Sequence, residues 1–154
     1  MLIITYILNP MSMENKPQPK ESVAMEENEL WNKHVLIADD DSELAGHTKG
    51  MLELMGYTAE IVADGRELLE RLEAAKPGEF GLIITDKEMA AGMDGVTAAI
   101  QIRQIENYKE IPLVLYSGTL KQDDVNIITK LGGICLKKPF SYEQLQDTVE
   151  AARS

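Results

Sequence analysis

Short strand-like runs alternate with longer segments of helical periodicity from residue 34 to the end of the chain. The predicted strands are residues 35–38, 58–63, 82–85, 113–116 and 134–136. The first, third and fourth of these runs are almost wholly apolar. Strands of that kind are buried on both faces, as in a parallel sheet that is covered by helices.

The segments that follow the strands place apolar residues at helical spacing. The predicted helices cover about residues 42–55, 66–75, 95–106, 123–131 and 141–152. Ser42 and Ser141 are the expected N-caps of the first and last helices, and Gly56 ends the first. Five strand–helix pairs with right-handed crossovers predict a doubly wound α/β fold. Its expected five-stranded parallel sheet has the flavodoxin-like strand order 2-1-3-4-5, with ligands at the carboxyl ends of the strands.

Residues 1–33 differ in character from the rest of the chain and are expected to be a disordered tail before one folded domain at 34–153. Pro10, Pro17 and Pro19 interrupt this segment, and much of it is polar and weakly periodic. The apolar start MLIITYIL has no preceding basic residues and is too short to cross a bilayer. We therefore expect neither a signal peptide nor a membrane anchor there.

Composition narrows the classes of function. Aspartate and glutamate outnumber lysine and arginine by 26 to 15, so the formal net charge is −11. Direct binding to nucleic acid or to an anionic membrane needs a basic surface, which argues against both partners. One cysteine and two histidines exclude an internal disulfide, a cysteine-based zinc cluster and a histidine-rich metal site. A cytoplasmic protein is expected.

Polar residues follow the predicted strands at the edge where ligands bind in such folds. The residues at the ends of the first, third, fourth and fifth strands are Asp39-Asp40-Asp41, Asp86, Ser117 and Lys138. The carboxyl ends of parallel strands share one edge, so carboxylates, a hydroxyl and an ammonium should converge on one cleft.

This combination favours phosphoryl transfer. Clustered carboxylates repel one another and need a cation. Oxygen ligands favour a hard divalent ion, and Mg²⁺ takes one or two carboxylates and keeps waters. An aspartate can attack phosphorus while a metal and a lysine offset charge on the transferring oxygens.

Each residue also has a plain structural explanation when it is taken alone. Asp41 suits a helix cap, Lys137 a surface position and Cys135 a small buried hydrophobe. His47 suits the solvated face of the first helix. A lone aspartate at a strand end is ordinary turn chemistry. The functional interpretation depends on several strands ending in suitable residues in the right order.

The segments VLIADDDS, LIITDKEM, MDG, IPLVLYSG and LKKPF resemble those of response-regulator receiver domains in two-component signalling. The resemblance extends over about residues 34–153. It implies that Asp86 is the phosphoacceptor and a metal ligand, and that Asp40 binds Mg²⁺ directly. It further implies that Asp39 completes the acidic pair without binding the metal directly, and that the backbone carbonyl of Glu88 is another ligand.

The resemblance also implies how the signal is formed and passed on. Ser117 would be the switch hydroxyl, Lys138 would pair with the phosphoryl group, and the Lys138–Pro139 peptide would be cis. The phosphoryl donor would be a histidine kinase or a histidine phosphotransfer protein, and the output a contact with a downstream protein. The domain would assist its own phosphorylation and dephosphorylation without being an enzyme for a separate substrate.

Two positions depart from the family pattern. The segment Met89-Ala90-Ala91-Gly92 is one residue longer than usual and lacks the usual proline. Cys135 stands where the family usually has an aromatic switch residue. Two alternatives stay open. One is a degenerate receiver that acts as an interaction module without phosphorylation. The other is a phosphatase of the haloacid-dehalogenase type, because Asp39-x-Asp41 resembles the opening motif of such enzymes.

Overall fold

The computed structural model describes residues 32–90 and 92–154. The tail expected over residues 1–33 lies outside the described residues, apart from Asn32 and Lys33. Ala91, in the loop that departs from the family pattern, also lies outside them.

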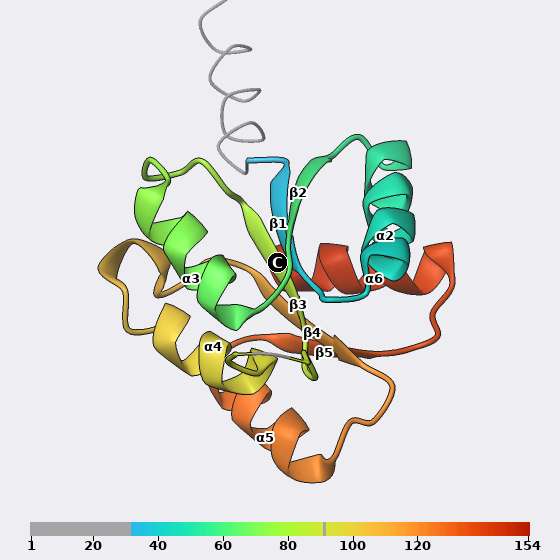
Figure 1. The fold of residues 1–154 in the computed structure, drawn as a ribbon. Helices are drawn as coiled ribbons and strands as arrows, with labels where there is room; N and C mark the ends of the chain where they lie inside the picture. The colour runs from blue at the N-terminus through green and yellow to red at the C-terminus, as the bar shows by residue number, and fades with distance from the viewer. Residues whose placement is uncertain (1–31, 91) are drawn as a thin grey trace, which may run out of the picture. The chain divides into compact units, whose positions relative to one another are not determined.

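The described residues form one parallel sheet with the order β2-β1-β3-β4-β5, which confirms the predicted topology (Figure 1). The strands are β1 (His34–Ala38), β2 (Thr58–Val62), β3 (Leu82–Asp86), β4 (Leu113–Ser117) and β5 (Ile134–Lys137). β1 and β3 are neighbours although a helix, a strand and a second helix separate them in the sequence. This crossover brings the end of β1 beside the end of β3.

Helices cover both faces of the sheet (Figure 1). They are α2 (Ser42–Leu54), α3 (Gly65–Ala74), α4 (Gly95–Ile102), α5 (Gln122–Lys130) and α6 (Tyr142–Arg153), with a 3₁₀ turn η1 (Glu106–Tyr108). α2 contacts β1 and β2 while α6 contacts β4 and β5, whereas α3, α4 and α5 pack together on the opposite face. Within residues 32–90 and 92–154, none of the helices has the length and apolar character that crossing a bilayer requires.

The helix ends differ from the predicted ones at two places. Asp41, not Ser42, is the N-cap of α2, because its side chain accepts a hydrogen bond from the Leu44 N–H at 3.1 Å. The predicted helix 95–106 ends at Ile102. From there the backbone changes to bonds that span three residues: the Gln104 N–H donates to the Gln101 carbonyl at 3.0 Å and the Ile105 N–H to the Ile102 carbonyl at 3.1 Å. The guanidinium of Arg103 then donates to the carbonyls of three residues in other segments: Tyr108, Ile111 and Leu131.

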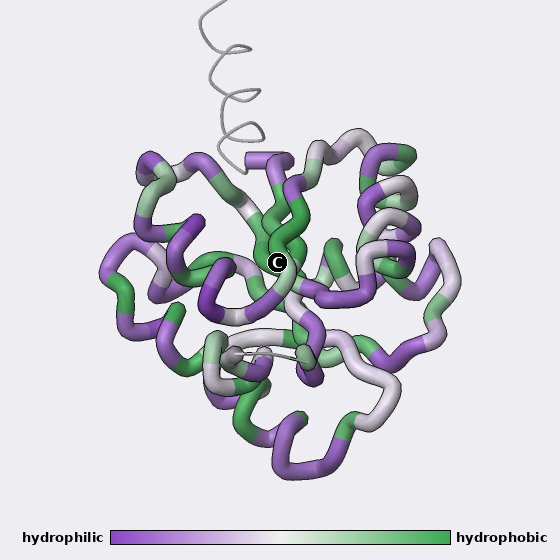
Figure 2. The backbone as a smooth tube through the Cα atoms, in the orientation of Figure 1, coloured by the Kyte–Doolittle hydropathy of each residue, from purple (hydrophilic) through white to green (hydrophobic). Residues whose placement is uncertain are grey.

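The core consists of buried residues from the strands and from the helices that pack on them, and successive strand residues point alternately to the two layers of helices. Leu36, Ile83 and Leu115 are fully buried on the face of α3, α4 and α5. Figure 2 shows the hydrophobic residues concentrated along the central strands, whereas hydrophobic and hydrophilic residues alternate along the outer helices. Burial of each such side chain contributes about 2 kcal/mol, so the sheet is a firm support for the polar residues at its edge.

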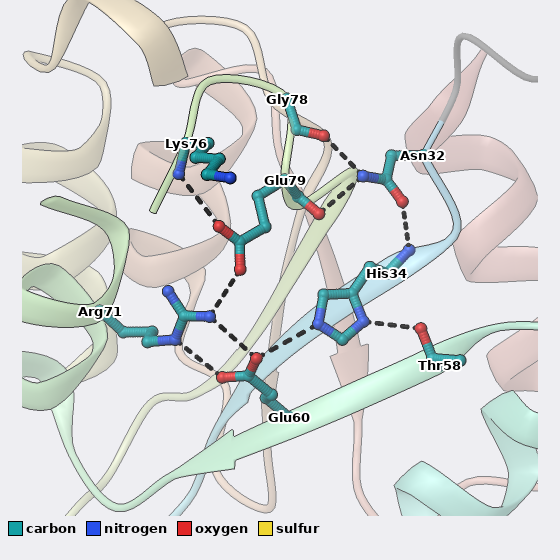
Figure 3. A network of polar contacts seen from close by, with 8 residues as sticks. All are labelled: Asn32, His34, Thr58, Glu60, Arg71, Lys76, Gly78 and Glu79. Atoms are coloured by element: carbon teal, nitrogen blue, oxygen red, sulfur yellow. Dashed lines mark hydrogen bonds and ion pairs between the residues drawn. The ribbon is translucent and has the colours of Figure 1, made fainter. Parts of the chain in front are cut away.

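A network of polar side chains lies near the amino-terminal end of β1 (Figure 3). Arg71 donates to Glu60 at 2.8 Å and 2.9 Å and to Glu79 at 2.6 Å. Asn32 donates to the carbonyl of Glu79 at 2.6 Å, and its side-chain oxygen accepts from the His34 N–H at 2.9 Å. This network ties the start of β1 to the turn before β3, at the edge opposite the carboxyl ends of the strands.

Gly95 fixes the distance between α4 and β3. Its N–H donates to the carbonyl of Lys87 at 2.9 Å. A methyl group on Gly95 would overlap the backbone carbonyl oxygen of Asp86. The start of α4 therefore lies directly against the main chain of Asp86.

We expect Gly95→Ala to lower the free energy of unfolding by about 2 kcal/mol, because the added methyl group pushes α4 away from β3. The matched control is Gly46→Ala on the exposed side of α2, where a Cβ has no neighbour within 4 Å. That change should raise the free energy of unfolding by up to about 1 kcal/mol through helix propensity. Urea unfolding followed by circular dichroism measures both. Equal stability of the two variants would contradict the close approach.

Candidate functional site

Three aspartates meet where β1 and β3 end. Ala38 and Thr85 are partners in the register of these strands, so Asp39 and Asp86 follow at the same level. Asp39, Asp40 and Asp86 each offer a carboxylate oxygen, and these oxygens lie within 4.8 Å of one another. Asp39 and Asp86 are buried, with 1% and 6% of their surface exposed, whereas Asp40 is exposed. Oxygen donors at this spacing suit a hard divalent cation.

Lys138 is the cation that the described chain places against these carboxylates. Its Nζ lies 3.1 Å from Asp86 Oδ1 and 3.6 Å from Asp39 Oδ2. Its backbone N–H donates to the carbonyl of Ser117 at 2.8 Å, which holds it beside the end of β4. The Lys138–Pro139 peptide is cis, as expected. One ammonium therefore faces two buried carboxylates.

Burial raises the pKa of Asp86 from 3.8 to about 6. The positive charge and hydrogen bond of Lys138 work in the opposite direction, and the negative charge of Asp39 adds to the rise. The ionised carboxylate is thus costly in the folded protein, which makes a bound cation or a covalent modification of Asp86 favourable.

Asp39 accepts hydrogen bonds from two donors, and neither contact was predicted from the sequence. The Tyr116 hydroxyl donates to Asp39 Oδ2 at 2.6 Å, and the Asp41 N–H donates to Oδ1 at 3.0 Å. Burial, followed by the hydrogen bond to Asp39, raises the pKa of Tyr116, so its hydroxyl remains a proton donor. A single hydroxyl-bearing ring in an otherwise aliphatic strand, next to Ser117, was the signal available in the sequence.

Ser117 lies at the same sheet edge but is not joined to the carboxylates in this structure. It is fully buried, and its Oγ accepts a hydrogen bond from the Thr119 N–H at 3.0 Å. Successive strand residues point to opposite faces, so Ser117 points away from the face of Tyr116. The hydroxyl would have to turn, together with its loop, to reach Asp86.

The two loops beside the cleft are linked through their side chains. Thr119 Oγ1 donates to Glu88 Oε2 at 2.7 Å. Lys87 Nζ lies 2.7 Å from Asp124 Oδ2 on α5 and donates to the Thr119 carbonyl at 3.3 Å. The side chain of Lys87 is therefore directed at α5 and not at the carboxylates. These contacts join the loop after β3 to the loop after β4.

One of the two departures from the family pattern contacts this site. The Ala90 N–H donates to Asp40 Oδ2 at 2.5 Å, so the longer loop contacts the acidic pair directly. Cys135, on β5, is partly buried and packs against the buried hydrophobic residues on the face of α3, α4 and α5. Burial raises the pKa of its thiol. It offers no ring that could move with Ser117.

We expect Asp86→Asn to raise the free energy of unfolding of the metal-free protein at pH 7 by on the order of 1–2 kcal/mol. The reason is that a carboxyl with a pKa of about 6 in the folded protein, and 3.8 otherwise, ionises first in the unfolded chain as the pH rises. The stability of the wild type should therefore fall between about pH 4 and pH 6, and its difference from Asp86→Asn should shrink toward pH 4.

Urea unfolding in EDTA across this pH range measures the difference. Asp147→Asn, which changes an exposed carboxylate on α6, should leave the stability within about 0.5 kcal/mol of the wild type. A pH-independent difference between Asp86→Asn and the wild type would contradict the raised pKa.

Comparison with known proteins places this geometry in a family. The chain matches the family model described as the response regulator receiver domain over residues 35–150. It is 28% identical over 120 residues to the chemotaxis protein CheY-3 of Vibrio cholerae, covering 77% of this chain and 90% of that protein.

Solved structures agree. The structure of the chemotaxis response regulator CheY4 of Vibrio cholerae has a TM-score of 0.69 at 28% identity, covering 79% of this chain and 98% of that one. The receiver domain of a sensor histidine kinase from Pseudomonas aeruginosa has a TM-score of 0.68 at 25% identity, covering 80% and 99%, and holds a magnesium ion in its active site cleft. The present chain thus belongs to the response regulator receiver domains of two-component signalling.

Proposed function

We propose that this protein is a working phospho-accepting receiver in which Asp86 takes a phosphoryl group from a histidine kinase or a histidine phosphotransfer protein. The observation that supports this most is the position of Asp86. It is a buried carboxylate, 3.1 Å from Lys138, in a group of three aspartates with Asp39 and Asp40. A nucleophile beside a cation, with further acidic groups for a metal, is the arrangement that phosphoryl transfer needs.

The same proposal includes Mg²⁺. The donor set fits this ion, because the side-chain ligands available are carboxylate oxygens within 4.8 Å of one another. Asp40 and Asp86 would bind it directly, together with the backbone carbonyl of Glu88, and Asp39 would lie beside these ligands without binding the ion directly. When bound, the ion supplies positive charge that neutralises the phosphoryl oxygens and draws the donor to the cleft. The kinase receiver domain with magnesium in its cleft supports this assignment.

The residues of this chain have distinct roles in the proposed step. A carboxylate oxygen of Asp86 forms the new bond to phosphorus while the bond from phosphorus to the donor breaks. Lys138 pairs with the phosphoryl oxygens, since its Nζ already lies beside Asp86. Ser117 then turns toward the same oxygens, giving up its hydrogen bond with Thr119. The new acceptor oxygens thereby bias a two-state loop.

The output is proposed to be a contact with another protein in the cytoplasm. A net charge of −11 argues against nucleic acid and anionic membrane as partners. Leu44, which is half-buried, and His47, which is exposed, lie on α2 next to the acidic pair and are candidates for kinase or phosphotransfer docking. Residues 34–153 would carry this function, with residues 1–33 as a tail.

Neither alternative from the sequence gains support from the structure. A degenerate receiver would lack a usable nucleophile or lysine, and a dehalogenase-type phosphatase would attack through an aspartate after β1. The membership of the receiver family favours neither. The position of the phosphoryl group separates all three.

We expect acetyl phosphate or a histidine kinase to phosphorylate the wild type on Asp86 in the presence of Mg²⁺ and not in EDTA. Asp86→Asn should abolish the modification, because the amide is no nucleophile. Intact mass spectrometry, followed by borohydride reduction and peptide mapping, gives the stoichiometry and the position.

Asp41→Asn is the matched control. Asp41 is next to the acidic pair, but its side chain caps α2, and asparagine caps as well as aspartate. This variant should be phosphorylated like the wild type. Full phosphorylation of Asp86→Asn would refute the assignment, and no phosphorylation of the wild type by any donor would favour the degenerate receiver.

The lifetime of the phosphoryl group should depend on Glu88. Its carboxylate, held by Thr119 at 2.7 Å, carries a negative charge beside the cleft that can repel the phosphoryl group or orient a water. We expect Glu88→Ala to slow autodephosphorylation several-fold, equivalent to about 1 kcal/mol in the barrier. Decay of labelled phosphoprotein at fixed Mg²⁺ measures this, with the exposed Glu150→Ala as control. An unchanged half-life of the phosphoprotein in Glu88→Ala would contradict a role of the Glu88 side chain and leave only the proposed role of its backbone carbonyl in metal binding.

A further inference from the structure

Tyr116 is a buried aromatic residue on the face of β4 that carries the phosphoacceptor site. It is fully buried, and it pairs in register with Asp86 on β3 and with Leu136 on β5. Registered residues of parallel strands point to the same face, so its ring lies on the side of the Asp86 carboxylate. The ring also stacks on Phe140, with 5.7 Å between the centroids.

The ring and its hydroxyl contact both charged partners of Asp86. The hydroxyl donates to Asp39 Oδ2 at 2.6 Å, the same oxygen that lies 3.6 Å from Lys138 Nζ. The ammonium of Lys138 lies 4.5 Å from the ring centroid of Tyr116, within the range of a cation–π contact. A single residue therefore touches the carboxylate and the lysine that together determine the electrostatics around Asp86.

We propose that Tyr116 is a positioning residue of the phosphoacceptor site, which holds Asp39 and leaves Lys138 directed at Asp86. This inference rests on the proposed function. The hydroxyl takes part of the hydrogen-bonding demand of Asp39 Oδ2, so Lys138 remains closer to Asp86, at 3.1 Å, than to Asp39. The ammonium of Lys138 lies over the face of the Tyr116 ring, and this contact limits where the ammonium can move.

The physical reason lies in the burial of Asp39. A carboxylate with 1% of its surface exposed must satisfy its oxygens within the protein. Without the hydroxyl, Lys138 is the side-chain partner that remains for Asp39 Oδ2, and the stronger attraction draws the ammonium away from Asp86. The carboxylate also gains freedom to rotate, so the three acidic groups are less well arranged for Mg²⁺.

The competing explanation is that the hydroxyl merely satisfies a buried ring. The chain offers a matched control for this. Tyr108 is also buried, with 3% of its surface exposed, and its hydroxyl donates to the Leu72 carbonyl at 2.8 Å. Leu72 belongs to α3, on the face of the sheet that does not carry the carboxylates. Tyr108→Phe and Tyr116→Phe each remove one buried hydroxyl, and only the latter touches the site.

Calorimetric titration of the full chain with Mg²⁺ tests the proposal. We expect Tyr116→Phe to weaken Mg²⁺ binding by about ten-fold, the lower end of what outer partners of a metal site contribute. Tyr108→Phe should bind Mg²⁺ like the wild type. With acetyl phosphate at saturating Mg²⁺, Tyr116→Phe should also accept phosphate more slowly than Tyr108→Phe, because its lysine is less well placed.

The metal-free protein supplies an independent readout. In protein labelled with ¹³C-aspartate, the carboxyl resonance of Asp39, assigned by its loss in Asp39→Asn, should move in Tyr116→Phe and stay in Tyr108→Phe. An unchanged Mg²⁺ dissociation constant in Tyr116→Phe, or an equal change in both variants, overturns the inference. If the wild type neither binds Mg²⁺ nor accepts phosphate, the proposed function fails instead, and the Asp39 resonance alone decides whether Tyr116 positions that carboxylate.

Discussion

Repulsion among the carboxylates of Asp39, Asp40 and Asp86 is the constraint around which the rest of this molecule is arranged. Two of these groups are buried, and a single ammonium, that of Lys138, stands against them. Such a cluster lowers the stability of a small domain, and a folded chain can hold it only where other interactions are in surplus. Here the buried strands supply that surplus, which allows buried carboxylates to remain at the sheet edge.

Each carboxylate is held in a different way. Asp86 has the lysine, Asp39 has the hydroxyl of Tyr116 and a backbone N–H, and Asp40 has the N–H of Ala90. These donors hold the three acidic groups in fixed positions in the folded protein. The close contact of Gly95 with the main chain of Asp86 also fixes the position of the Asp86 backbone.

The topology and the acidic cluster could be predicted because they depend on local signals. Apolar runs identify buried parallel strands, and parallel strands bring their carboxyl ends to one edge. The end of α4 could not be predicted in this way, since residues 96–110 contain no glycine or proline that would mark it. The role of Tyr116 was missed because its partner Asp39 is 77 positions away. Its position one residue before Ser117 indicates that the two side chains point to opposite faces of the sheet. Only the register with β3 places the Tyr116 ring on the face of the Asp86 carboxylate.

The contacts between the two loops have a consequence for ionic strength. Lys87 and Asp124 keep only 14% and 13% of their side-chain surface exposed, so salt screens this pair less than it screens charges on the open surface. The acidic exterior of a chain with a net charge of −11 behaves in the opposite way, and its attraction for a basic partner fades as salt rises. The rate of encounter with a partner and the Lys87–Asp124 ion pair, which joins the loop after β3 to α5, therefore differ in their sensitivity to salt. A change in ionic strength would alter how often the domain meets its partners while leaving its own loops joined.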